Sequence, residues 1–564
     1  MYIRIKQTPR SQSISVQLVE SFREKGKIKQ RVLRHVGTAS SPQKIEELKR
    51  LALVIKTELQ HQNIYQHLVD ATSHYASVFG NLLEVPEKLL LHAAYLEESQ
   101  RHIVGIHDIY GYIYDYLGFS NLFSNPARRV HAAKILRDVV LARIAFPKSK
   151  RASVEFLAEK FGLVLELEHV YQMMDKMDDH FFNKIQQAAL GAALKLSGGK
   201  LRILFYDATT LYFESFTEDE LKSNGYSKDL KFNQPQVVLA LFVTEYGLPV
   251  GYELFPGNTF EGHTLIPALE KLRERYLLED VIFVADRGLF NEENLKLLES
   301  KNFKYVVGAK IKNLSKTLEK EVLNLDNYHS SQLDFKTTRS QQEKSKHSIA
   351  TFAYHEGRRL IVHYSEKRAK KDAYDRQKSI EKLYKKMMRS QNPKSLLNNF
   401  GYKKYLEVEG NAKLSINQSK IEEASRWDGL AGIVTNIKDT RPEELLTHYR
   451  GLYQIEECFR INKHDLRMRP IFHWKPHRVK AHIAIAFMAF VCVKYLEYRM
   501  KTQSAKVSPE EIRKALLCTQ ATVFHDKKLK QQFLLPSKVN PIAKEIYRVM
   551  RIKSPKKILA IKKL

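Results

Sequence analysis

Two aspartates follow apolar runs that are typical of buried strands. Asp207 comes directly after ILFY, and Asp286 ends the run VIFVAD just before Arg287 and Gly288. An unpaired carboxylate in a central strand costs roughly several kcal/mol, so Asp207 requires a cation, a metal or a proton. The carboxyl ends of strands are also where ligands lie in α/β sheets. Either aspartate alone could instead cap the turn or helix that follows it.

A third carboxylate lies in the segment THYRGLYQIEECFRINKHD, which has the periodicity of one long helix. Polar side chains recur there every seven residues, and a step of seven drifts only about 20° on a helix, so they form one stripe. They are Tyr449, Glu456 and Lys463. An apolar stripe about 40° away comprises Leu445, Leu452 and Phe459. Glu456 is therefore expected at the edge of the buried face, although a solvated salt bridge to Arg460 is the simpler alternative.

Three carboxylates that converge on one end of an α/β core would form a site for two divalent cations. Mg²⁺ prefers carboxylate oxygens, with water and phosphate in its remaining positions. Two such ions activate the attacking water or hydroxyl and stabilise the leaving oxygen of an in-line phosphoryl displacement. The protein then has little to add beyond positioning and charge neutralisation.

With these residues in place, the sequence resembles insertion-sequence transposases of the DDE type, in the subgroup with the Tyr-Arg-Glu-Lys (YREK) signature, Y-x2-R-x3-E-x6-K. Tyr449, Glu456 and Lys463 occupy their signature positions, whereas Leu452 occupies the Arg position. The segments FYDATTLYFES, VADRG and RPIFHWKPHRVKAH are also similar to the family, as is the long insertion between Asp286 and Glu456. The resemblance covers most of the chain.

The resemblance implies a ribonuclease-H-like catalytic core in which Asp207, Asp286 and Glu456 bind two Mg²⁺ ions, with Mn²⁺ as a substitute. It implies that Tyr449 and Lys463 hold DNA phosphate near the cleaved bond. Further candidates for DNA contacts, two of them possible replacements for the missing motif Arg, are Arg450, Arg460 and Trp474. Trp474 could stack on an unpaired base, although a core or interface position is the commoner role for Trp.

The implied reaction begins with binding of the element's terminal inverted repeats by a homodimer in a synaptic complex. Hydrolytic nicking then frees a 3′-hydroxyl, which attacks target double-stranded DNA. Two alternatives remain open from the sequence: a DNA-binding protein that has lost the chemistry, and a ribonuclease-H-like nuclease without strand transfer. Strand-transfer products would distinguish the transposase from the nuclease.

Charge and composition favour a nucleic-acid partner. The 564 residues include 93 Lys and Arg against 63 Asp and Glu, a net charge of +30, which calls for a polyanion unless it serves solubility alone. Three cysteines are too few for a disulfide framework, and the N-terminus lacks a signal peptide, so a cytoplasmic, nucleoid-associated protein is expected. No membrane partner is expected, because the longest apolar run, 483–493, is too short to span a bilayer.

No nucleotide cofactor is expected either, because SGGK at 197–200 lacks the first Gly and the final Ser or Thr of a P-loop. The periodicity predicts an α/β fold preceded by a mainly helical domain. Within the α/β fold, 235–258 predicts two strands joined as a hairpin around Tyr246 and Gly247. In the insertion, SIATFAYHEG and RRLIVHYSE are strand-like, and a highly basic helical stretch is expected from Lys367 to Arg389. The expected order is a β-hairpin region, a helical DNA-binding domain, the first part of the core, a β-rich and basic insertion, the second part of the core, and a basic helical C-terminal region. Their ranges are 1–40, 41–200, 201–311, 312–425, 426–503 and 504–564.

Overall fold

The computed structural model describes residues 1–7, 13–24, 27–65, 82–85, 91–123, 126–214, 217–225, 233–275, 280–289, 291–330, 347–389, 405–409, 413–504, 507–555 and 557–561. The chain forms two compact units. The first unit comprises Met1–Glu279 and Tyr453–Leu564, and the second comprises Asp280–Leu452.

The sheet that carries Asp207 in the first unit is antiparallel and follows the predicted strands. Its neighbours in order are β6 (Ile203–Tyr212), β7 (Gln236–Thr244) and β8 (Pro249–Pro256). The predicted hairpin between β7 and β8 turns at Tyr246 and Gly247, and Gly247 has a φ of 73°, a left-handed conformation that suits glycine. All residues of β7 and most residues of β6 and β8 are buried, as their continuous apolar runs predict.

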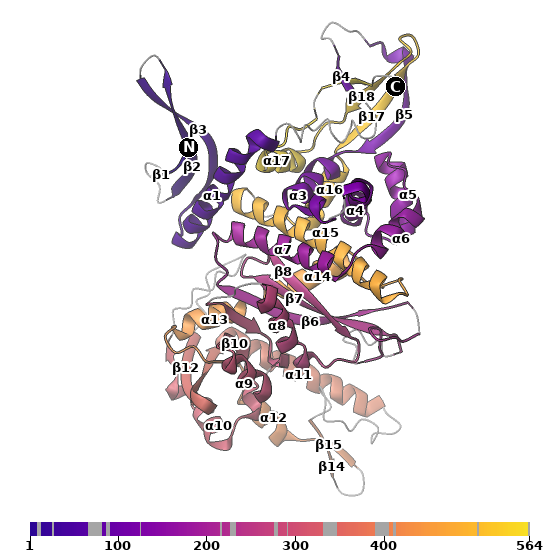
Figure 1. The fold of residues 1–564 in the computed structure, drawn as a ribbon. Coiled ribbons are helices and arrows are strands. Elements are labelled where there is room, and N and C mark those ends of the chain that lie inside the picture. Colours follow the sequence, from indigo (N-terminus) through magenta and orange to yellow (C-terminus); the bar gives the residue numbers. More distant parts are fainter. Residues whose placement is uncertain are drawn as a thin grey trace. The chain divides into compact units, whose positions relative to one another are not determined.

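Helices pack around this sheet. α7 (Asp179–Leu196) contacts β8, α14 (Tyr453–Arg460) contacts β6 and β7, and α8 (Leu265–Arg275) contacts β8. α15 (Pro476–Gln503) contacts β8 and packs against α7 and two further helices, α4 (Pro126–Ala145) and α6 (Leu167–Asp175) (Figure 1). α15 has the length and composition of a membrane span, but 94% of its most apolar window is buried inside the protein, which is the environment of a core helix.

The domain predicted as mainly helical for 41–200 contains mostly helices in its described part, together with two strands that were not predicted. α1 (Pro42–Tyr65), α3 (Tyr112–Tyr116), α4, α5 (Lys150–Phe161), α6 and α7 are helices as expected. The same range also contains strands β4 (Leu82–Glu84) and β5 (Leu96–Ile103). β5 has mostly exposed polar residues, so it lacks the alternating apolar pattern by which a strand is recognised.

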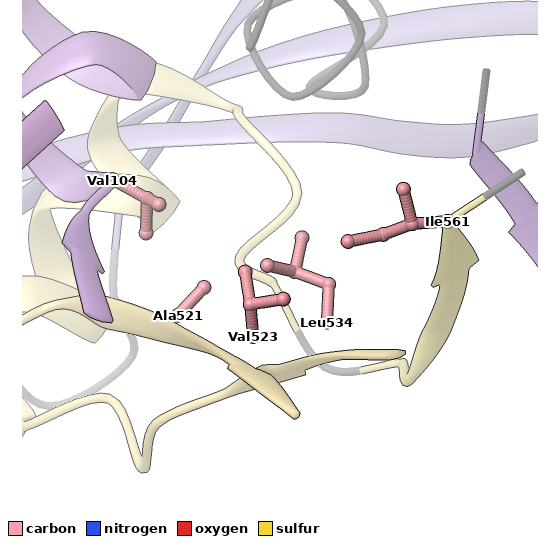
Figure 2. Close-up of a cluster of buried hydrophobic side chains, with 5 residues drawn as sticks. All are labelled: Val104, Ala521, Val523, Leu534 and Ile561. Carbon is pink, nitrogen blue, oxygen red and sulfur yellow. The ribbon is translucent and has the colours of Figure 1, made fainter. Parts of the chain in front are cut away.

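The C-terminal region is likewise not wholly helical, because it supplies the partners of these strands. α16 (Pro509–Leu517) and α17 (Pro541–Met550) are helices, but β17 (Gln520–Asp526), β18 (Gln531–Pro536) and β19 (Leu559–Ile561) complete a sheet of order β4-β19-β18-β17-β5. Figure 2 shows the apolar cluster on this sheet, formed by Val104, Ala521, Val523, Leu534 and Ile561. β17 pairs with β5 across about 420 residues of sequence, and no local pattern reveals such a pairing.

The N-terminal hairpin is present and has one more strand than predicted. β2 (Ile14–Glu24) and β3 (Lys27–Ala39) form the hairpin, and β1 (Tyr2–Gln7) pairs with β2.

The second unit contains a mixed sheet of order β11-β12-β13-β16-β10-β9. Its strands are β9 (Ile282–Ala285), β10 (Lys304–Gly308), β11 (His329–Ser330), β12 (His347–Tyr354), β13 (Arg358–Ser365) and β16 (Leu430–Thr435). β9 and β10 are parallel, and β13 and β16 are antiparallel. Strands β12 and β13, predicted within the insertion, therefore extend the same sheet as β16.

Helices and a small hairpin complete the second unit. The helices are α9 (Glu292–Ser300), α10 (Lys316–Leu323), α11 (Glu366–Arg389), α12 (Gln418–Ser425) and α13 (Pro442–Arg450). The hairpin consists of β14 (Leu406–Glu409) and β15 (Lys413–Ile416). The basic helix predicted from Lys367 to Arg389 is α11.

Candidate active site

Asp207 lies in the middle of β6 and is half-buried, whereas the residues on either side of it along the strand are buried. The backbone N–H of Ala208 donates a hydrogen bond to Asp207 Oδ1 at 2.7 Å. The preceding Tyr206 points to the face of α8, because its hydroxyl donates to Thr264 Oγ1, next to that helix, at 2.7 Å. Since side chains alternate along a strand, Asp207 points to the opposite face of the sheet.

That opposite face is the one covered by α15. Asp207 pairs across the sheet with Leu241, and Leu241 pairs with Tyr252 on β8. Directly paired residues point to the same side, and the Tyr252 ring packs on Phe487 of α15 with ring centroids 4.8 Å apart. The Asp207 carboxylate is therefore presented toward the helical layer rather than toward α8.

Glu456 is on α14, which packs against β6 and β7. The buried face of α14 is held by Cys458, whose thiol donates to the Gly247 carbonyl at 3.6 Å, and by neighbouring apolar residues. Glu456 is exposed and lies beside the buried Phe459, because residues three apart are neighbours on a helix. The first unit thus carries Asp207 and Glu456 on elements that pack together.

The alternative salt bridge from Glu456 to Arg460 is not formed. Arg460 Nη1 instead lies 3.4 Å from Asp465 Oδ1, within the π-helical turn η11 (Ile461–Asp465) that continues α14. Lys463 is in the same turn and is half-buried.

The single long helix predicted for this region is wrong. α13 ends at Arg450, a turn at Gly451 and Leu452 follows, and α14 begins at Tyr453. Gly451 has a low helix propensity, and its N–H bonds to carbonyls three and four residues back close α13. Tyr449 and Glu456 therefore belong to separate helices, and the continuous stripe with Lys463 does not exist.

Asp286 follows β9 directly, as the strand pattern predicts, and its side chain is exposed. The hydroxyl of Tyr449, in the last turn of α13, donates a hydrogen bond to Asp286 Oδ1 at 3.3 Å. Burial, and then the negative charge of Asp286, raise the pKa of Tyr449 well above its usual value. Tyr449 is thus a neutral donor at physiological pH, and the second unit brings Asp286 and Tyr449 together.

Gly308, at the end of β10, leaves room for this contact, and no motif in the sequence singles it out. A Cβ at residue 308 would lie 2.3 Å from the Tyr449 hydroxyl oxygen and 3.0 Å from the backbone nitrogen of Arg287. The sequence feature that could identify this position is a single glycine at the end of an apolar strand. A glycine there often marks a close approach of other atoms.

Leu452, which occupies the motif Arg position, and Arg450, two residues before it, are both half-buried. Burial, with a smaller contribution from the Arg368 guanidinium, lowers the pKa of Arg450 to about 10. Burial, followed by the charge of Arg450, lowers the pKa of His363 on β13 to about 3. α13, the helix that ends at Arg450, packs against β9, β10 and β12.

Trp474 is 72% exposed, which does not fit the core position that was the commoner expectation. The segment before it is anchored at the end of β6: Ile471 forms a parallel bridge with Phe213, and the Arg469 guanidinium lies 5.5 Å from the centre of the Tyr212 ring. The nearby Phe472 is also exposed. An aromatic side chain in this position is accessible for stacking on a base.

The candidate metal ligands fit a divalent cation by their chemistry, because all three are carboxylates. Asp207 and Glu456 lie in the first unit, and Asp286 lies in the second. Across the described residues, no three His, Cys, Asp or Glu side chains are grouped so that they could hold a metal ion.

Comparison with known proteins identifies the family. The Transposase DDE domain matches residues 198–492, more than half of the chain, and the N-terminal domain of IS1634 family transposases matches residues 3–62. A comparison with curated proteins finds no match.

Two solved structures of Mos1 transposase are similar to parts of the chain. "Mos1 transposase paired-end complex with left transposon end" is 15% identical, with 32% of this chain and 60% of that chain covered and a TM-score of 0.14. "Crystal structure of the Mos1 mariner paired end complex with Mn" is 14% identical, with 46% and 77% covered and a TM-score of 0.14. The chain thus spans about three-fifths of the first structure's chain.

The domain match from 198 to 492 includes the strand, the strand end and the helix that carry Asp207, Asp286 and Glu456. The chain therefore belongs to the DDE transposase family.

Proposed function

We propose that this protein is an insertion-sequence transposase that binds terminal inverted repeats, cleaves the element ends by metal-dependent hydrolysis, and joins the 3′-hydroxyl ends to target DNA. The observation that carries the proposal is the Transposase DDE domain match, which includes all three candidate carboxylates. A ribonuclease-H-like core is supported by three antiparallel strands, β6 to β8, followed by helices and the parallel strands β9 and β10.

The metal ligands in this proposal are Asp207, Asp286 and Glu456. Bound Mg²⁺ or Mn²⁺ ions would activate the attacking water or 3′-hydroxyl and stabilise the leaving oxygen. Asp207 is suited to this role because its strand fixes the backbone, and the Ala208 N–H orients its carboxylate. Glu456 and Asp286 are suited because both are exposed at the ends or edges of ordered elements.

Tyr449 would orient Asp286 or donate to a DNA phosphate, since its hydroxyl is neutral and already directed at the Asp286 carboxylate. Lys463, Arg450 and Arg460 would add positive charge near the phosphates. Trp474 would stack on an unpaired base, which its exposure allows.

The partners in this proposal are the element ends and target double-stranded DNA, bound by a homodimer in a synaptic complex. The net charge of +30 supports a DNA partner. The helical region within 41–200 is assigned to end recognition on the basis of its charge and position. A cytoplasmic, nucleoid-associated location agrees with three free thiols, of which those of Cys458 and Cys492 are buried.

The test is incubation of the full chain with a labelled duplex that carries the DNA flanking its reading frame, with Mg²⁺ or with chelator. The proposal expects metal-dependent nicking at an element end and joined products when target DNA is added. If the protein cuts the duplex but forms no joined products, it is a nuclease without strand transfer. Tight binding of the end without cutting would leave a DNA-binding protein without chemistry, and restoring Arg at Leu452 would then be the first variant to examine.

A further inference from the structure

The outer face of α11 carries a row of exposed, mostly basic side chains. The six residues are spaced three or four apart and lie within about 80° of helix circumference at 100° per residue. They are Lys367, Lys371, Tyr374, Lys378, Lys382 and Lys385, and all six are exposed. We call them the α11 stripe.

The opposite face of α11 fixes the helix to the second unit. Leu383 is fully buried in a cluster with Tyr405 and Leu406. Arg376 donates two hydrogen bonds to the Asp428 carboxylate, at 2.5 and 2.6 Å. The α11 stripe is therefore held on a rigid helix and directed outward.

Three of the five lysine side chains in the α11 stripe carry uncompensated charge. Within the described part of the chain, the ammonium groups of Lys367, Lys371 and Lys385 make no hydrogen bond or ion pair. Lys378 lies over the Tyr374 ring, 4.6 Å from its centre. The neighbouring Lys370, outside the stripe, pairs instead with Glu366 at 3.0 Å.

The α11 stripe begins near the candidate active-site residues of the second unit. β13 runs parallel to β9 and β10 in the sheet, so it ends at the edge where Asp286 follows β9, and α11 begins directly after β13. From Lys367 to Lys385 the helix rises about 27 Å. One strand of duplex DNA presents about eight phosphates over that length, at 3.4 Å per phosphate along the axis.

We propose that the α11 stripe is a binding surface for the phosphate backbone of duplex DNA, leading away from the Asp286 end of the second unit. This inference rests on the proposed function, and it assigns to a specific surface part of the DNA binding that the net charge implies. Lysine ammonium groups would contact phosphates without reading bases, so the surface adds affinity and not sequence preference. The Tyr374 ring would pack beside the strand and keep Lys378 in place.

The experiment compares two variants of the full chain with equal net charge. Lys371→Gln with Lys385→Gln removes two charges of the stripe, and Lys370→Gln with Lys386→Gln removes two charges from adjacent positions outside it. Binding to a labelled element-end duplex and to an unrelated duplex of equal length is measured from 50 to 200 mM salt. The stripe variant is expected to bind both duplexes about tenfold more weakly, with a log–log salt slope shallower by about two. The control variant is expected to stay within about threefold of the native protein.

Equal losses in the two variants, or native binding by the stripe variant, would overturn the assignment. Tighter binding of an RNA duplex than of DNA by the native protein would overturn the choice of partner. If the native protein cuts the end duplex but the two variants bind DNA with equal affinity, the α11 stripe is not a DNA-binding surface. The transposase proposal would then still stand. Native protein that binds no duplex would refute both. Matching far-ultraviolet circular dichroism and melting temperatures would exclude misfolding as the cause of a loss.

Discussion

The Tyr449 hydroxyl lies 3.3 Å from Asp286 Oδ1 and donates a hydrogen bond to it. The bond joins the last turn of α13 to the residue that follows β9. Burial and the charge of Asp286 raise the pKa of Tyr449, so the hydroxyl keeps its proton at neutral pH. Two segments about 160 residues apart therefore define one half of the candidate active site.

Replacing Tyr449 by Phe should slow cleavage without weakening DNA binding much. A hydrogen bond to a charged group contributes roughly 1.5–3 kcal/mol, so its loss from the reacting arrangement predicts about a tenfold to hundredfold lower single-turnover rate. Tyr384→Phe is the control, because Tyr384 is exposed on α11 and lies outside both the candidate site and the α11 stripe. If Tyr449→Phe cleaves DNA at the native rate, the Tyr449 hydroxyl does not contribute to cleavage.

Gly308→Ala should disturb the contact between Tyr449 and Asp286. The new Cβ would clash with the Tyr449 hydroxyl, which predicts about 1–3 kcal/mol lower unfolding free energy and slower cleavage. When Gly308→Ala is combined with Tyr449→Phe, the losses in stability and in cleavage rate should be smaller than the sums of the losses in the single variants. A double-mutant cycle measures this difference. The control is Gly191→Ala in α7, where a Cβ meets nothing within 4 Å and helix propensity improves by up to about 1 kcal/mol. Full additivity would show that Gly308 acts elsewhere.

Stability should fall as the pH rises from about 4 to about 7 because of Asp108. Burial raises the pKa of this side chain from 3.8 to about 7, despite a 2.5 Å hydrogen bond from the Tyr547 hydroxyl. The folded state thus favours the protonated carboxyl. Its contribution is complete below pH 4 and is lost by about pH 7, with a size of up to about 4 kcal/mol.

Melting temperatures of the native protein and Asp108→Asn between pH 4 and 8 test this prediction. The melting temperature of Asp108→Asn should fall much less between pH 4 and 7 than that of the native protein. Tyr547→Phe should extend the decline to higher pH, because the bond it removes lowers the pKa of Asp108. Parallel curves for the native protein and Asp108→Asn would assign the pH dependence to other groups.

The sequence predicts those elements whose signal is local. The apolar runs before Asp207 and Asp286 identify β6 and β9, and alternating patterns identify β12, β13 and the N-terminal hairpin, because burial of one or both faces dictates residue type. The basic helix α11 is predicted for the same reason: its buried and exposed faces differ in composition along its whole length.

The elements that escape prediction depend on distant partners or on a single residue. β5 is a strand because β17 pairs with it from the other end of the chain, and its own residues are polar and exposed. The break between α13 and α14 depends on Gly451 within an otherwise continuous helical pattern. The role of Gly308 depends on its contact with Tyr449 in the folded protein. A contact between distant segments leaves no periodic signal in the sequence.

The central claim is that the chain cuts DNA with metal held by Asp207, Asp286 and Glu456. The most direct measurement is single-turnover cleavage of the element-end duplex in Mg²⁺, comparing the native protein with Asp207→Asn, Asp286→Asn and Glu456→Gln, alongside calorimetric titration of each protein with Mn²⁺. The account predicts that each variant binds the duplex like the native protein, cuts it roughly a hundredfold or more slowly, and binds Mn²⁺ more weakly. Cleavage at the native rate by any of the three variants, or native cleavage in chelator, would contradict it.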